Sequence, residues 1–108
     1  MPYDEALATR LRHALSGVAG VSERSMFGGL CFLLDGNMLC GVEKTRYMFR
    51  VGKEKEAAAL ARPGAAPMDF TGRPLGGMVW VDAAECRGWR LAGWLSLARA
   101  FVGKLPKK

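Results

Sequence analysis

Residues 21–51 read VSERSMFGGLCFLLDGNMLCGVEKTRYMFRV, and this stretch decides the fold. Asp35-Gly36 stands between two apolar runs, which indicates a two-residue hairpin because both central positions of such a turn adopt positive φ. Gly28-Gly29 separates an earlier run from this hairpin. The stretch therefore predicts a meander of antiparallel strands at 22–27, 30–34, 37–42 and 46–51.

The last of these strands alternates most clearly. One face carries Tyr47, Phe49 and Val51, and the other carries Arg46, Met48 and Arg50. Such alternation is typical of an antiparallel strand that is buried on one face and solvated on the other.

The segments on either side of the meander predict helices and a second hairpin, because apolar residues recur there at helical or alternating spacing. The helices are expected at 3–16, 53–62 and 82–102, and the strands of the hairpin at 67–70 and 77–81. The last helix is expected to begin at Asp82, because Asp82-Ala83-Ala84-Glu85 has capping-box spacing. The predicted fold is α+β, with two layers: an antiparallel sheet, made of the meander and the second hairpin, flanked by N-terminal and C-terminal helices in the order α-β-β-β-β-α-β-β-α. A length of 108 residues suits a single domain over 1–108.

Two interpretations of the cysteines are compatible with the sequence. A regular register from the hairpin places Cys31 opposite Cys40 at a non-hydrogen-bonded position, so a redox-responsive pair is one hypothesis. Simple burial is the other, because free cysteine is among the most buried residues and a one-residue shift of the loop would destroy the pairing. Three cysteines without C-x-x-C spacing and a single histidine, His13, predict no disulfide framework, metal site or cofactor.

The final helix has two faces with different expected roles. Leu91, Trp94, Leu95, Ala98, Val102 and Leu105 fall on one arc that should cover the sheet. The other side groups apolar and small residues, Trp89, Gly93, Ser96, Leu97 and Ala100. We interpret this second face as an interface for a protein partner, including a second copy of this chain. The alternative is that a loop of the same chain covers Trp89.

Positive charge is concentrated at the end of the chain. Residues 85–108 hold six Lys/Arg against one Asp/Glu, whereas residues 1–84 hold ten against nine. Such a segment can attract nucleic acid or an acidic protein surface, or it can simply solubilise a tail. The candidate basic contacts, Arg87, Arg90, Arg99 and Lys104, do not fall on one helical stripe. Direct nucleic-acid binding is therefore only weakly supported.

The ends and the apolar runs of the chain predict its location. The N-terminus lacks the basic region and apolar run of a signal peptide, and no apolar stretch approaches the ~20 residues that span a bilayer. We therefore expect a cytoplasmic protein with no membrane partner.

The run Ser25-Met26-Phe27-Gly28-Gly29-Leu30, followed by Asp35-Gly36-Asn37-Met38 and Tyr47-Met48-Phe49-Arg50-Val51, resembles the N-terminal domain of the TfoX/Sxy family of bacterial competence regulators. The resemblance implies an α+β fold with an antiparallel sheet, and a relation to the transcriptional regulation of DNA uptake. It brings no catalytic residue. Those regulators carry a second, C-terminal domain, and we expect this chain to be a stand-alone N-terminal domain. In the shared motif, Phe27 is expected to enter the core while Gly28-Gly29 lets the backbone reverse.

Two classes of function follow from these residues. The first is a non-catalytic interaction or regulatory module, linked through the resemblance to transcription or DNA uptake. The second is a small-molecule binder or an enzyme whose site forms at the sheet face. No paired carboxylates, Cys/His set or Ser/His/Asp combination stands out, so we favour the first class and expect no enzyme activity. A deep apolar cavity with convergent polar groups would favour the second class.

Overall fold

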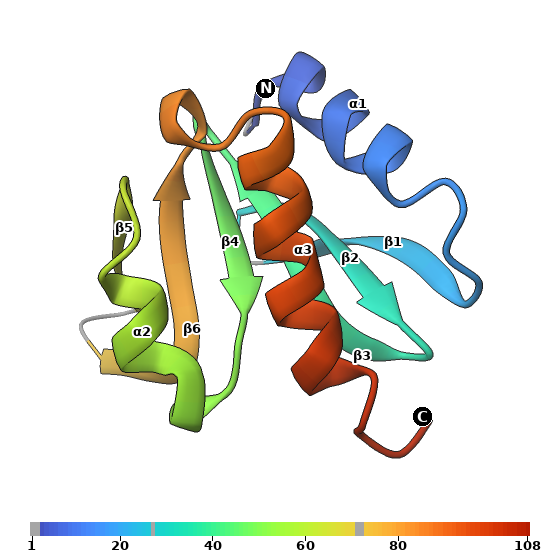
Figure 1. The fold of residues 1–108 in the computed structure, drawn as a ribbon. Coiled ribbons are helices and arrows are strands. Elements are labelled where there is room, and N and C mark those ends of the chain that lie inside the picture. Colours follow the sequence, from blue (N-terminus) through green and yellow to red (C-terminus); the bar gives the residue numbers. More distant parts are fainter. Residues whose placement is uncertain (1–2, 27, 71–72) are drawn as a thin grey trace.

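A computed structural model describes the backbone of residues 3–26, 28–70 and 73–108, and the side chains of these residues outside 69–75. Helices and strands follow one another in the order expected from the sequence (Figure 1). The helices are α1 (Glu5–Ala14), α2 (Glu56–Leu60) and α3 (Trp89–Val102), with short 3₁₀ helices η1 (Lys53–Lys55) and η2 (Ala83–Glu85). The strands are β1 (Val21–Met26), β2 (Gly29–Leu34), β3 (Asn37–Glu43), β4 (Arg46–Arg50), β5 (Ala65–Phe70) and β6 (Arg73–Asp82).

The strands of the described residues form one antiparallel sheet in the order β1-β2-β3-β4-β6-β5. The first four are the expected meander, and β6 of the second hairpin pairs with β4. The α+β prediction is therefore confirmed, and so is the order of its elements.

Two glycine-containing turns set up the meander. Asp35 and Gly36 both have positive φ, 51° and 85°, as a two-residue hairpin requires. Gly28 also has a positive φ of 74°, and a Cβ on Gly29 would collide with the carbonyl oxygen of Val42. A side chain is therefore excluded at Gly29 by the neighbouring strand. The expected burial of Phe27 lies outside the described residues.

All three helices lie on one face of the sheet, in front of it in Figure 1. Between the helices and the sheet lies a large apolar core. Phe49 of β4 stacks on Trp94 of α3, with ring centroids 5.3 Å apart. Tyr47 donates a hydrogen bond from its hydroxyl to the carbonyl oxygen of Leu7, 3.1 Å away, which ties α1 to the sheet. We call these residues the helix-side core; it also contains the predicted apolar arc of α3, Leu91, Trp94, Leu95, Ala98 and Val102, with Leu105 packed against it.

The opposite face of the sheet is not solvated as the alternation at 46–51 predicted. Met48 is fully buried there, because side chains from neighbouring strands surround it. The guanidinium of Arg46 lies 3.6 Å from the ring centroid of Trp80 and covers part of this face. The cluster, which we call the methionine layer, consists of Cys31, Met48, Met68, Met78 and Trp80, with Met26 and Met38 packed against it.

The predicted pairing of Cys31 with Cys40 is wrong. Leu33 pairs with Met38 as the hairpin register requires, but Phe32 then pairs with Cys40 and Cys31 with Gly41. Leu39 is thus an extra residue in β3, a β-bulge that shifts the register by one. As a result Cys40 lies in the helix-side core and Cys31 in the methionine layer, on opposite faces of the sheet.

The final helix also begins later than predicted. The Asp82 side chain does accept a hydrogen bond from the backbone N–H of Ala84, 3.0 Å away, but it caps only the 3₁₀ helix η2. At Cys86 the backbone leaves helical geometry, with φ −133° and ψ 65°, and its side chain enters the helix-side core. The helix proper starts at Trp89. Within the described residues, no helix is long and apolar enough to cross a membrane.

Candidate binding surface on the terminal helix

The face of α3 that points away from the sheet carries the most exposed large apolar side chain of the described residues. Trp89, in the first turn, is 79% exposed. The loop that could have covered it is therefore not found in the described part of the chain. Arg90 beside it lies 5.3 Å from the indole centroid and donates a hydrogen bond to the carboxylate of Glu85, 2.6 Å away. This ion pair holds the guanidinium beside the exposed ring.

Two hollows flank α3, and they divide the predicted interface residues between them. The upper hollow, of about 350 Å³, contains Trp89 and Gly93, with Trp94 and Arg62 among its other walls. The guanidinium of Arg62 lies 5.0 Å from the ring centroid of Trp94. Arg62 also lies beside Gly93, where an added Cβ would make an ordinary contact with the guanidinium at 3.7 Å.

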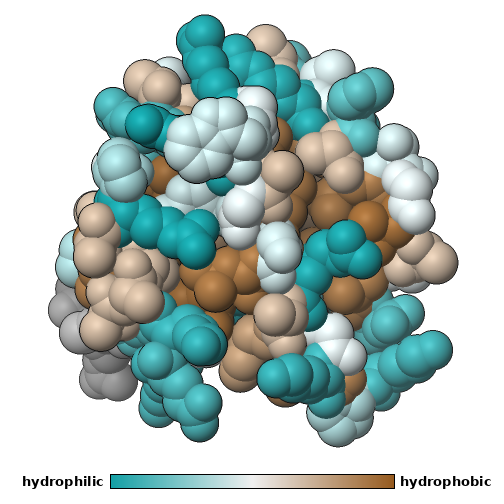
Figure 2. Space-filling view, viewed as in Figure 1, coloured by the Kyte–Doolittle hydropathy of each residue, from teal (hydrophilic) through white to brown (hydrophobic). Residues whose placement is uncertain are grey.

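The lower hollow, of about 630 Å³, lies between the last turns of α3 and the segment that joins β4 to η1. Leu97, Ala100 and Lys104 of the predicted surface line it. Figure 2 shows hydrophobic surface in the middle of this face, with hydrophilic side chains around it. Ser96, the remaining residue of that surface, is exposed and lines neither hollow.

The basic residues are distributed as their spacing suggested. Arg90 belongs to the upper hollow and Lys104 to the lower one. Arg87 and Arg99 are exposed and line neither. The two hollows therefore do not bring the four residues together.

Half of the lower hollow was not found from the sequence. Arg50, Val51, Gly52, Lys53 and Lys55 come from the end of β4, from η1 and from the two residues between them, 34 to 39 positions before α3 begins. The alternation of Lys and Glu at 53–56 marked only an exposed short helix. Nothing in the local pattern indicates which distant segment packs beside it, since that depends on how β6 and α3 return to the sheet.

The cysteines and the histidine line neither hollow. All three cysteines are buried. Burial raises the pKa of the Cys31 thiol to about 11 and that of the Cys86 thiol to about 12, so both remain protonated at neutral pH. His13 is exposed on α1, and no cluster of His, Cys, Asp and Glu among the described residues could hold a metal ion. The surface of α3 offers apolar contact through Trp89 and positive charge through Arg90 and Lys104.

The sequence from residue 13 to residue 98 matches the family model of the TfoX N-terminal domain. The chain belongs to this family. The match includes the six strands of the described residues and ends within α3, so the sheet of this TfoX N-terminal domain, as far as it is described, lies inside the matched region. No curated protein and no solved structure matches the chain.

Proposed function

We propose that this TfoX N-terminal domain is a non-catalytic regulatory module of the bacterial cytoplasm that binds a protein partner through the outer face of α3. Its expected setting, from the family resemblance, is the control of transcription or DNA uptake. The observation that supports the proposal is the 79% exposure of Trp89. An aromatic side chain that is exposed in the free protein and buried in a complex is a frequent energetic centre of an interface.

The surroundings of Trp89 fit such a role. The upper hollow lies beside the ring, so a partner side chain can enter next to it. Arg90 is paired with Glu85, so the rim offers a guanidinium and a carboxylate for polar contacts. Tryptophan and arginine are enriched at energetic centres of interfaces, and Trp89 has the additional advantage that little conformational entropy is lost when its ring is fixed.

Affinity capture followed by titration tests this function. Tagged wild-type protein would be used to capture partners from bacterial lysate, and each purified candidate would be titrated calorimetrically. We expect Trp89→Ala to weaken the binding of the true partner by about thirtyfold, corresponding to ~2 kcal/mol. Trp89→Phe should retain most of the affinity because it keeps an aromatic ring. Thr9→Ala, on the exposed side of α1, is the matched surface control and should change nothing.

Two outcomes would contradict the proposal: an affinity that Trp89→Ala leaves unchanged, or a loss of equal size with Thr9→Ala. Light scattering separates a second copy of this chain from other partners. If the partner is a second copy, the mass of wild type is that of a dimer and Trp89→Ala is a monomer. Equal masses for the two proteins would exclude a dimer formed through Trp89.

A further inference from the structure

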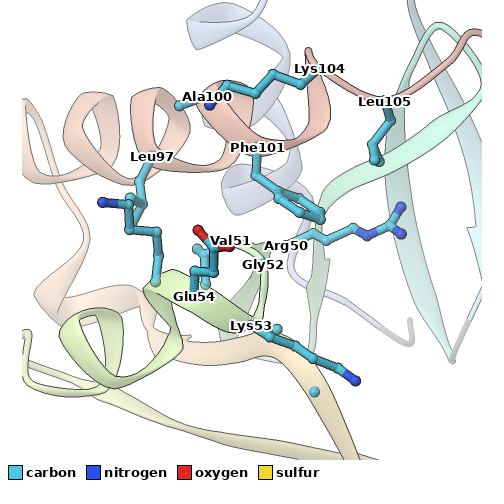
Figure 3. Close-up of a pocket in the computed structure, with 13 residues that line it drawn as sticks. Arg50, Val51, Gly52, Lys53, Glu54, Leu97, Ala100, Phe101, Lys104 and Leu105 are labelled. Carbon is cyan, nitrogen blue, oxygen red and sulfur yellow. The ribbon is translucent and has the colours of Figure 1, made fainter.

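The lower hollow combines an apolar floor with positively charged edges. Val51 is fully buried at its base, and Leu97 and Phe101 form its α3 wall. Figure 3 shows the side chains of Leu97 and Phe101 extending from α3 toward the segment 51–54. A volume of about 630 Å³ lies within the ~300–1,000 Å³ range of small-molecule sites.

The floor of the hollow is held by backbone hydrogen bonds and close packing. The N–H groups of Val51 and Gly52 both donate to the carbonyl oxygen of Gly77, at 2.8 and 3.0 Å. Gly77 in turn donates from its N–H to the Glu56 carboxylate, 2.8 Å away. The ring of Phe101 packs so closely on Gly52 that a Cβ there would come within 2.5 Å of the ring. The hollow is therefore formed before any ligand arrives, which lowers the entropic cost of binding.

Positive charge surrounds this floor on both sides. Arg50, Lys53 and Lys55 line it from the strand and η1, and Lys104 lines it from α3. One carboxylate, that of Glu54, opposes these four cations, and in Figure 3 it points into the space between the segment 51–54 and α3. The ion pairs found between described side chains involve none of these five residues. Their charges are thus available to a ligand, and their sum favours an anion.

We propose that the lower hollow binds a small amphipathic carboxylate, with its apolar body over Leu97 and Phe101 and its carboxylate near the cations of the rim. A single negative charge fits best, because the Glu54 carboxylate repels any further charge placed at the centre of the hollow. The proposal does not rest on the partner contact at Trp89, since Trp89 lies in the upper hollow and the two hollows share no lining residue. Failure of one proposal therefore leaves the other intact.

Three ten-carbon probes of nearly equal size test the role of charge. Sodium decanoate, decan-1-ol and decylamine would each be titrated into the protein below their aggregation limits, with binding followed by calorimetry and by amide chemical-shift changes in NMR spectra. Decanoate should bind most tightly, with shifts centred on Gly52, Gly77 and Phe101. Decanol should bind more weakly and decylamine least. Of the three probes, decanoate alone should bind more weakly at raised salt, because screening reduces its attraction to the rim.

Charge variants give changes of opposite sign. Lys55→Glu and Lys104→Glu should each lower the affinity for decanoate on the order of tenfold, because each replaces attraction by repulsion near the surface. Glu54→Gln should raise the affinity for decanoate severalfold. Lys107→Glu is the matched control: it makes the same charge change in the exposed tail, outside the hollow, and should have little effect.

A steric pair completes the experiment. Ala100→Trp should fill the hollow and abolish decanoate binding, whereas Ala92→Trp places the same bulk on an exposed part of α3 outside both hollows and should leave binding unchanged. Thermal unfolding would verify that each variant is folded. Decylamine binding as tightly as decanoate, or Lys107→Glu weakening decanoate as much as Lys104→Glu, would overturn the proposal. The proposal would also be overturned if Ala100→Trp did not reduce decanoate binding. It would be overturned as well if the protein sedimented with phosphatidylglycerol vesicles but did not bind decanoate.

Discussion

The helix-side core and the methionine layer lie on opposite faces of the same strands but are built differently. The helix-side core joins aromatic and branched side chains from helices and strands, such as the stacked pair Phe49 and Trp94. The methionine layer is built from strands alone and contains Met48, Met68 and Met78. Branched and aromatic side chains fix the position of a helix by their shape, whereas unbranched methionines adapt to an irregular surface. The comparison suggests that the first face specifies the fold and the second fills space.

The largest expected effect is on the helix side. Phe49→Ala should destabilise the protein by ~3–5 kcal/mol, because it removes a fully buried ring and leaves a cavity against α3. Urea denaturation, followed by circular dichroism, measures this change. A cost below ~1 kcal/mol would mean that α3 collapses into the cavity, against our account of a shape-specific core.

Alkaline pH tests whether both faces exclude water. The pKa of Cys31 is raised by burial from 9.0 to about 11, and that of Cys86 to about 12. Above pH ~9 the unfolded chain loses thiol protons that the folded protein keeps, so the free energy of unfolding should fall by up to ~1.4 kcal/mol per pH unit for each thiol. The contribution of Cys31 is fully present below pH ~9 and is lost by about pH 11, and that of Cys86 by about pH 12.

Urea titrations between pH 8 and pH 11 on wild type, Cys31→Ala and Cys86→Ala separate the two contributions. Each variant should show a shallower alkaline decline than wild type. If only Cys86→Ala does so, water reaches the methionine layer and the two faces differ in solvation as well as in packing.

A conservative exchange sharpens the contrast in adaptability. Met48→Leu in the methionine layer should cost less than ~1.5 kcal/mol, because the volume is conserved and the neighbouring methionines can adjust. The reverse exchange, Leu39→Met in the helix-side core, should lower the free energy of unfolding by more. Both are measured by urea denaturation of purified variants. A larger cost for Met48→Leu than for Leu39→Met would reverse the assignment of the adaptable face.

The smallest expected effect concerns the edge of the methionine layer. Arg46 lies over the ring of Trp80 and donates two hydrogen bonds to the Glu43 carboxylate, at 3.0 and 2.8 Å. Its side chain is 42% exposed, so Arg46→Ala should cost only ~0.5–1 kcal/mol. Arg46→Lys should recover part of the loss. Intrinsic tryptophan fluorescence during urea denaturation follows both variants, and no change with Arg46→Ala would show that the cation does not stabilise this face.

The sequence-based predictions succeed where a local pattern determines the structure. Asp35-Gly36 and Gly28-Gly29 place the turns, and the apolar arc of α3 identifies the residues that face the sheet. They fail where the outcome depends on distant packing. The bulge at Leu39 could not be seen, because Leu39 is as apolar as its neighbours and a regular register also gave a plausible strand.

The binding surface was likewise predicted only in part. Trp89 and Leu97 were found because they share one helical face, but the two hollows that separate them are formed by Arg62 and by the segment 50–55, which approach α3 only in the folded chain. The late start of α3 had a similar cause. The capping spacing at Asp82 was real but served a 3₁₀ turn, since the chain leaves helical geometry at Cys86, whose side chain is buried in the helix-side core.

The bulge in β3 also constrains how the chain can change in length. With Leu39 present, Leu39 and Cys40 both lie in the helix-side core although they are consecutive residues. Deleting either one would restore strict alternation, and the pairings of Leu33 with Met38 and of Cys31 with Gly41 would stay in register, so the other residues of the strand would keep their faces. Deletion of Leu39 or Cys40 should thus be tolerated better than a single-residue deletion in β4, which has no bulge in its pairing with β3 and would move side chains to the opposite face.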